Sequence, residues 1–229
     1  MKYKKKDQLF EYLIYGNEEN VLRFIKSKNI FIDDTFHHPP DFKQLLIFMY
    51  KDIITDKKLL VFYILVNSKE QQLYDLVFDS IIKIIHSFGC KEINTETVVT
   101  DQETALINRV NKYFPNAQRI SCYFHYKSDI FKNLKKYGLW RKDLKKTYTI
   151  ILGILYSLPI IYNGNMKMIT NDKNMEVYSN YLENYFKIYK YKYFADNSLN
   201  YDAVPRDCRT NNFIENYNGY IKKKLRKKN

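Results

Sequence analysis

Residues 97–125 constrain the fold more than any other stretch, because a short apolar run ends at an acid and leads into a helix pattern and a second strand pattern. The β-branched run 97–99 predicts a strand, and apolar residues at a period near 3.6 predict the helix after it. Those residues are Ala105, Leu106, Val110 and Phe114. Pro115 breaks the helix before a second strand predicted over 119–124. Asp101 then stands at the carboxyl end of a strand, where open α/β sheets place their sites, although a helix cap or turn is the alternative role for such an Asp.

Three strand-like segments precede this unit, at 29–36, 44–53 and 59–66. The last two are joined by a hairpin-length turn, which predicts an antiparallel meander. An amphipathic helix is predicted over 69–88, and a basic helix over 126–138 follows the strand–helix–strand unit. This order of elements is that of an RNase H-like α/β fold, with helices on both faces of the sheet.

We predict four segments along the chain. They are an N-terminal helical arm (1–28), a core with the first two acids (29–138), an all-α insertion (139–201) and a C-terminal helix with a basic tail (202–229). The arm is expected to form one or two short helices over 6–27. The tyrosines of the insertion could stack on nucleic-acid bases or, as we prefer, pack helix against helix.

The net charge of +13 and the pI near 9.4 favour a polyanionic partner such as nucleic acid. An A/T-rich coding sequence produces the same excess of Lys, Asn, Ile and Tyr, so that reading stays open. Three cysteines without a repeated spacing argue against a disulfide framework. No apolar run reaches the length of a membrane span, and the N-terminus lacks a secretory signal, so we expect a soluble intracellular protein with no membrane partner.

A third acid, Glu215, stands on a helix predicted to begin near Thr210 or Asn211. That helix could bring its carboxylate to the strand end that holds Asp101, where Asp33 also closes a strand. Carboxylates packed together repel one another unless cations lie between them, and hard oxygen ligands favour Mg²⁺ or Mn²⁺.

Three motifs resemble the catalytic core of Mutator-like element (MULE) transposases, which belong to the DDE/D class on the RNase H-like fold. They are IDDTFHHPPDFKQLLIFMY, VVTDQETALINRVNKYFPNAQRISCYFH and RTNNFIENYN. The middle motif is the most specific, with its strand-end TD, an Ala in the next turn, FP at the helix end and C-x-x-H at the next strand. The resemblance runs from about residue 29 to residue 225.

The resemblance implies that Asp33, Asp101 and Glu215 are the catalytic acids and hold two Mg²⁺ or Mn²⁺ ions. Asp34 stands where the family usually has Gly, so either acid of the pair could be the first ligand. The auxiliary residues are Asp34, Cys122, His125, Asn212 and Asn218. Cys122 and His125 match the family's C-x-x-H, and no zinc site is expected there because two ligands alone do not make one.

The implied function is a DNA transposase that cleaves element ends and transfers them into target DNA, as a homo-oligomer on DNA and in the nucleus. The DNA-binding residues would be Lys127, Lys132, Lys135, Lys136, Lys222, Lys223, Lys224 and Arg226. The basic tail could instead be a solvated helix end or a nuclear localisation signal. The alternatives are a domesticated or degenerate core that binds DNA or protein without cutting, and a cellular nuclease on the same fold.

Overall fold

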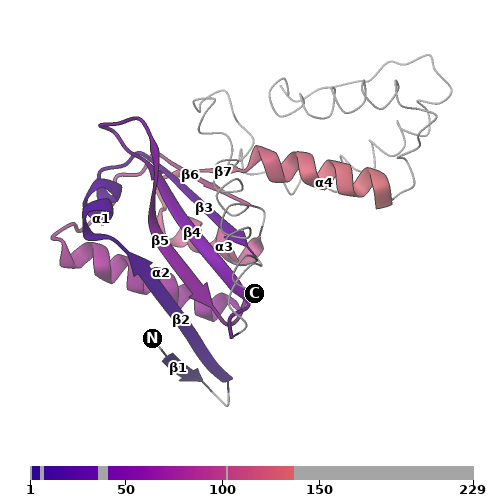
Figure 1. The fold of residues 1–229 in the computed structure, drawn as a ribbon, viewed down its shortest axis with the longest axis horizontal. Coiled ribbons are helices and arrows are strands. Elements are labelled where there is room, and N and C mark those ends of the chain that lie inside the picture. The colour runs from indigo at the N-terminus through magenta and orange to yellow at the C-terminus, as the bar shows by residue number, and fades with distance from the viewer. Residues whose placement is uncertain (1, 6–7, 36–40, 102, 137–229) are drawn as a thin grey trace, which may run out of the picture. The chain divides into compact units, whose positions relative to one another are not determined.

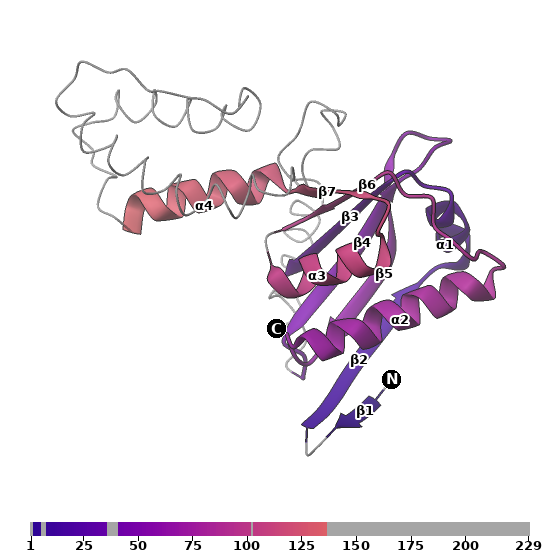
Figure 2. The same ribbon diagram turned by 180° about the vertical axis from the view of Figure 1, so that it is seen from behind.

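The structure is a computed structural model that describes residues 2–5, 8–35, 41–101 and 103–136. The described chain falls into two compact units, one that runs to Cys122 and one that begins at Tyr123. Figures 1 and 2 show the ribbon from two opposite sides. Helices and strands alternate in the first unit, so its fold is mixed α/β, as the sequence predicts.

The strands of the described chain form one sheet in the order β1-β2-β5-β4-β3-β6-β7. In chain order the elements are β1 (Lys2–Lys5), β2 (Gln8–Gly16), α1 (Glu18–Ile25), β3 (Asn29–Thr35), β4 (Gln44–Lys51), β5 (Lys58–Val66), α2 (Gln71–Ser87), β6 (Thr97–Thr100), α3 (Thr104–Tyr113), β7 (Gln118–Ser121) and α4 (Tyr123–Lys136). Strands β3, β4 and β5 pair antiparallel, whereas β3 with β6 and β6 with β7 pair parallel. An antiparallel meander is therefore continued by two parallel strands, which matches the predicted strand order.

The central strand β4 explains why the sequence is continuously apolar there. Its residues 44–50 are all buried, and β5 and β3 flank it in the sheet. A tight turn joins β4 to β5, and the Asp52 N–H donates to the Lys57 carbonyl oxygen at 2.8 Å to close it. Asp56 takes a left-handed φ of 57° in this turn, a conformation that Asp tolerates better than most residues.

Helices α1, α2 and α3 pack against the same face of the sheet, and Figure 2 shows α2 and α3 in front of it. The buried side of α2 repeats at helical spacing through Leu73, Val77, Ile81 and Ile85. Phe48 of β4 meets Phe78 of α2 edge to face, with ring centroids 5.5 Å apart. Each such side chain contributes about 1.5–3 kcal/mol by leaving water. Helical cover of the other face stays a prediction.

The N-terminal segment corrects one prediction, since residues 8–16 form a strand and only Glu18–Ile25 is helical. Phe10, Leu13 and Ile14 have helical spacing, which is why a helix was expected. However, Phe10 and Tyr12 are buried while Leu13 and Tyr15 are exposed, an alternation typical of a strand. Pairing with β5 decides the outcome, because it places Tyr12 opposite Val66 in the sheet.

Smaller differences concern where elements end. The strand predicted over 119–124 ends at Ser121, because α4 begins at Tyr123. The predicted boundary at 138/139, the insertion (139–201) and the C-terminal segment (202–229) lie outside the described residues. Among the described residues, no helix is long and apolar enough to cross a membrane.

Candidate functional site

Asp33 and Asp34 lie near the carboxyl end of β3, where β3 pairs in parallel with β6. Phe31 pairs with Val99 of β6, and Asp33 and Asp101 each come two residues later in the chain, so they stand near the same end of two adjacent strands. This is the juxtaposition that the sequence predicts for the first two acids. Asp33 is completely buried, whereas Asp101 is half-buried, just beyond the end of β6.

Asp33 and Asp34 have side chains on opposite faces of the sheet, because successive residues of a strand alternate. Asp34 follows Ile30 and Ile32, which belong to the core beneath α2 and α3, so its carboxylate lies on the helix-covered face. The Asp34 side chain is 8% exposed. On this face Asp34, Asp101 and Glu103 each offer a carboxylate oxygen within 4.8 Å of the others, and Asp33 is not a member of this group.

Glu103 was not identified from the sequence as a site residue. It is the residue before the first turn of α3, and its backbone N–H donates to Asp101 Oδ1 at 3.0 Å. Asp101 therefore acts as a turn acceptor that fixes Glu103 beside it, while Glu103 itself occupies the N-cap position. The sequence signal for Glu103 is its position two residues after Asp101, directly beyond a predicted strand.

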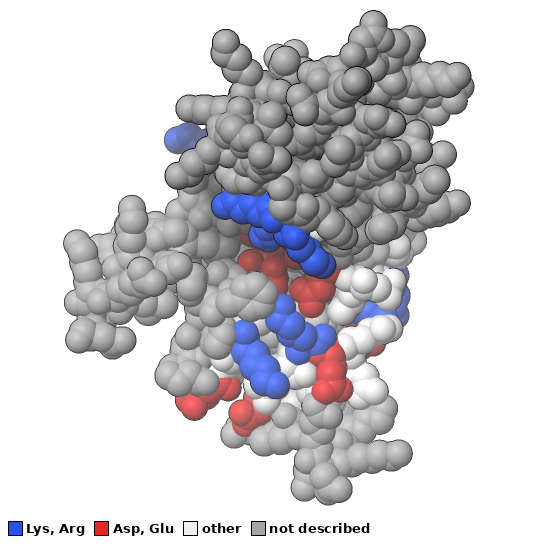
Figure 3. All heavy atoms as spheres, turned by 90° about the vertical axis from the view of Figure 1, so that its right-hand side faces the viewer, with Lys and Arg blue, Asp and Glu red and all other residues white. Residues whose placement is uncertain are grey.

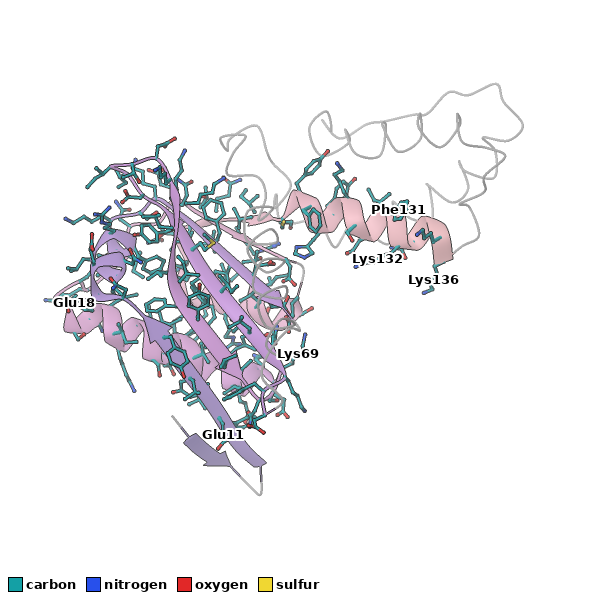
Figure 4. The ribbon with its side chains drawn as sticks, viewed as in Figure 1. Glu11, Glu18, Lys69, Phe131, Lys132 and Lys136 are labelled. Carbon is teal, nitrogen blue, oxygen red and sulfur yellow. The ribbon has the colours of Figure 1, made fainter. Side chains whose placement is uncertain are left out.

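The surroundings of Glu103 disfavour the charged form of its carboxyl. Its carboxyl lies in a part-buried position beside Asp34, and burial, followed by the Asp34 charge, raises the pKa of Glu103 above its usual value. Lys69 contributes one positive charge, with Nζ 3.4 Å from Asp34 Oδ2. Figure 4 places Lys69 near the start of α2, and on the face shown in Figure 3 acidic and basic side chains lie intermixed.

Two buried neutral side chains donate to these acids. Gln44, the first residue of β4, donates through Nε2 to Asp34 Oδ2 and to Glu103 Oε2, the latter at 3.4 Å. The Tyr74 hydroxyl of α2 lies 3.0 Å from Glu103 Oε1 and 3.0 Å from Gln44 Oε1. Burial and the Glu103 charge raise the pKa of Tyr74 far above its ordinary value, so the hydroxyl stays a donor.

The group has the chemistry of a divalent-cation site. Three carboxylates each offer an oxygen within 4.8 Å of the others, and Lys69 places a positive charge beside Asp34. Hard oxygen ligands from Asp and Glu are those that Mg²⁺ and Mn²⁺ take in proteins. A bound cation would also counteract the burial and the Asp34 charge that raise the pKa of Glu103.

Several predicted site residues have no described position. Glu215, Asn212, Asn218 and the basic tail residues Lys222, Lys223, Lys224 and Arg226 lie outside the described residues. Cys122 is buried just beyond the end of β7, and its N–H donates to the Thr100 carbonyl oxygen at 2.7 Å. His125 lies on α4 in the second unit, with its ring edge-on to Phe124.

Helix α4 carries the predicted phosphate-binding lysines among aromatic rings. Lys127 Nζ lies 5.6 Å from the ring centre of Tyr123, and Lys135 Nζ lies 4.4 Å from that of Phe131. The Lys132 side chain is 71% exposed, and its Nζ lies 3.6 Å from Asp129 Oδ1. Figure 4 shows Lys132 and Lys136 on the same helix. Cations held along aromatic rings suit contact with a phosphate backbone.

Comparison with known families identifies the middle of the chain. The model of the MULE transposase domain matches residues 29–129, from the first residue of β3 into α4. Residues 29–129 are thus similar to a MULE transposase domain. The matched stretch includes the four acids discussed above, Asp33, Asp34, Asp101 and Glu103, and supports a transposase-type function. No curated protein is significantly similar to the chain.

Proposed function

We propose that the chain is the catalytic domain of a DNA transposase with an RNase H-like core, which cleaves DNA strands and transfers them with the help of divalent cations. The MULE domain match and the meander continued by parallel strands support this proposal. The observation that carries it is the acid group at the carboxyl end of that sheet.

The residues that would hold a cation in the described chain are Asp34, Asp101 and Glu103. Asp33 and Glu215 are the further ligands that the family resemblance implies. Bound Mg²⁺ or Mn²⁺ supplies Lewis acidity, which activates the attacking water or 3′-hydroxyl and stabilises the leaving oxygen.

The chain's own residues supply orientation and backbone binding. The Asp101 carboxylate fixes the start of α3 and thereby places Glu103 next to it. The lysines of α4 would bind phosphates without reading base sequence, which gives affinity that falls with salt. We further propose transposon ends and target DNA as substrates, a homo-oligomer on DNA, and the nucleus as the place of action.

The test is nicking of supercoiled DNA by the full chain in Mg²⁺ or Mn²⁺. Asp101→Asn and Glu215→Gln are expected to lower the rate at least about 100-fold, because each removes a ligand charge. Glu96→Gln is the matched control, since Glu96 is an exposed acid paired with Lys28 away from the acid group. Its rate should equal that of the wild type.

Two outcomes would contradict the proposal. Salt-sensitive DNA binding without any cleavage would identify a core that no longer cuts. Cleavage that persists in both Asp101→Asn and Glu215→Gln would remove the acids from the mechanism. A requirement for transposon-end sequences, tested next with end-bearing and unrelated DNA, separates a transposase from a cellular nuclease.

A further inference from the structure

A chain of hydrogen bonds ties the acid group to two elements that contribute no acid to it. Gln44 begins β4 and Tyr74 lies in the second turn of α2, whereas Asp34 and Glu103 come from β3 and the start of α3. Gln44 is 0% exposed and Tyr74 is 1% exposed. Neither side chain can reach a ligand in solvent, so any effect on a bound cation must pass through the carboxylates.

The amide orientation of Gln44 follows from its partners. Its Nε2 has two hydrogens, and two carboxylates, one from Asp34 and one from Glu103, lie beside that nitrogen. Its Oε1 faces the Tyr74 hydroxyl, which can donate. The reverse orientation would set an oxygen against two carboxylates, so the acids and the amide orient one another.

Tyr74 completes the arrangement from the side of α2. Its single hydroxyl hydrogen has two acceptors at 3.0 Å, Gln44 Oε1 and Glu103 Oε1. The Asp34 and Glu103 carboxylates thus each contact at least one buried neutral donor. Such donors restrict the rotation of a carboxylate and leave its other oxygen lone pairs for a cation.

We propose that Gln44 and Tyr74 are positioning residues that hold the Asp34 and Glu103 carboxylates at the separation a small divalent cation requires. This inference rests on the proposed function, because it concerns the same acid group. Mg²⁺ demands near-ideal octahedral geometry, and Mn²⁺, which is also smaller than Ca²⁺, takes octahedral oxygen sites, whereas Ca²⁺ accepts flexible and irregular oxygen ligands. Loss of positioning therefore weakens binding of Mn²⁺ more than binding of Ca²⁺.

The experiment measures Mn²⁺ and Ca²⁺ affinity of the full chain by calorimetry, for the wild type, Tyr74→Phe and Gln44→Met. Tyr12→Phe is the matched control, because Tyr12 is also a buried tyrosine and its hydroxyl bonds to Ser80 Oγ of α2, at 2.8 Å. Tyr74→Phe and Gln44→Met should weaken Mn²⁺ binding about 10-fold or more and Ca²⁺ binding about threefold or less. Tyr12→Phe should change neither affinity.

A purely structural role makes a different prediction. Tyr74→Phe would then unfold more easily than the wild type, as is expected of Tyr12→Phe, but its folded form would bind Mn²⁺ like the wild type, which would overturn the proposal. Equal losses for Mn²⁺ and Ca²⁺ would also overturn it, since geometry would not be the cause. Absence of Mn²⁺ binding in the wild type would overturn the cation site itself and this inference with it. If Tyr74→Phe does not fold, Gln44→Met decides alone.

Discussion

The two ends of β4 carry buried polar groups in opposite electrostatic surroundings. Just past its last residue, the Asp52 carboxylate accepts the Thr55 hydroxyl at 2.7 Å, the Thr55 N–H at 3.0 Å and Arg23 Nη1 at 3.5 Å. The Thr55 hydroxyl is the largest of the causes that lower the pKa of Asp52. At the first residue, Gln44, two carboxylates converge, and the pKa of Glu103 is raised.

The difference teaches how a structural carboxylate is told from a functional one. Around Asp52 the chain supplies its own donors and a guanidinium, so the charge is stabilised and the β4–β5 turn is locked to α1. Around Glu103, burial and then the charge of Asp34 raise the pKa of the carboxyl. Perturbed carboxyl groups that lie together in this way are candidates for a functional site, which is the basis of the cation site proposed above.

The largest effect is expected from adding Mn²⁺. At a concentration 100 times the dissociation constant, a cation that binds only the folded state adds about 2.7 kcal/mol, which raises the melting temperature by roughly 5–10 °C. Glu103→Gln should lose most of that rise, because it removes one ligand charge. Differential scanning calorimetry measures the Mn²⁺-induced rise in melting temperature, with Glu96→Gln as the control. An equal rise in Glu103→Gln and Glu96→Gln would mean that the cation binds elsewhere.

The acid pair of β3 sharpens the same comparison. Asp34→Asn is expected to weaken Mn²⁺ binding about 10-fold, because Asp34 belongs to the acid group and Asp33 does not. Titration calorimetry on Asp33→Asn and Asp34→Asn compares the two positions directly. Unchanged binding in Asp34→Asn together with loss in Asp33→Asn would assign the ligand to the acid that the family resemblance implies.

At the other end of β4, removal of the carboxylate should act on folding alone. Asp52→Ala leaves the Thr55 donors and Arg23 without their shared acceptor in a position that is only 2% exposed. We expect the melting temperature to fall by about 5 °C or more, with the Mn²⁺-induced rise intact. A loss of the Mn²⁺ response would mean that the two ends of the strand are coupled.

The pH dependence of stability should have opposite signs at the two ends, measured in EDTA between pH 3 and 8. The pKa of Asp52 is lowered, so its stabilisation is present above pH ~4 and is lost as the pH falls. The pKa of Glu103 is raised, so ionisation of this carboxyl costs the folded state stability as the pH rises above the carboxyl's ordinary pKa. Asp52→Asn should therefore be most harmful near neutrality, and Glu103→Gln should become more stable than the wild type as the pH rises.

Hydrophobic periodicity was sufficient to predict most of the core. Segment 29–66 carries the pattern of three strands, and segments 71–87 and 104–113 each carry the pattern of a helix; the structure has all five elements. The prediction of a helix at residues 8–16 is wrong, because Phe10, Leu13 and Ile14 fit helical spacing as well as part of a strand pattern. What decides their structure is pairing with β5, more than forty residues away in the chain, which no local pattern contains.

The site was predictable only where an acid stands at a strand end. Asp101 has that local signal, and the β3–β6 register indeed places Asp33 near the same end of the adjacent strand. The membership of Glu103, and the contacts of Gln44 and Tyr74, depend on how α3 and α2 pack over the end of β4. Such packing joins residues that are about thirty to sixty positions apart, so sequence spacing carried no trace of it.

The smallest expected effect concerns the turn that holds Asp52. Asp56 has a φ of 57° and forms an exposed ion pair with Lys51 at 3.0 Å. Asp56→Gly keeps the left-handed conformation and loses the ion pair, so it should change stability by less than about 1 kcal/mol. Asp56→Ala loses the ion pair and also strains the left-handed backbone, so it should be less stable than Asp56→Gly by about 1 kcal/mol, because a β-carbon without a local hydrogen bond is strained at this φ.

Urea unfolding of Asp56→Gly and Asp56→Ala compares their free energies of unfolding. Equal stability of the two would show that the backbone of this turn adapts to a residue with a β-carbon at position 56.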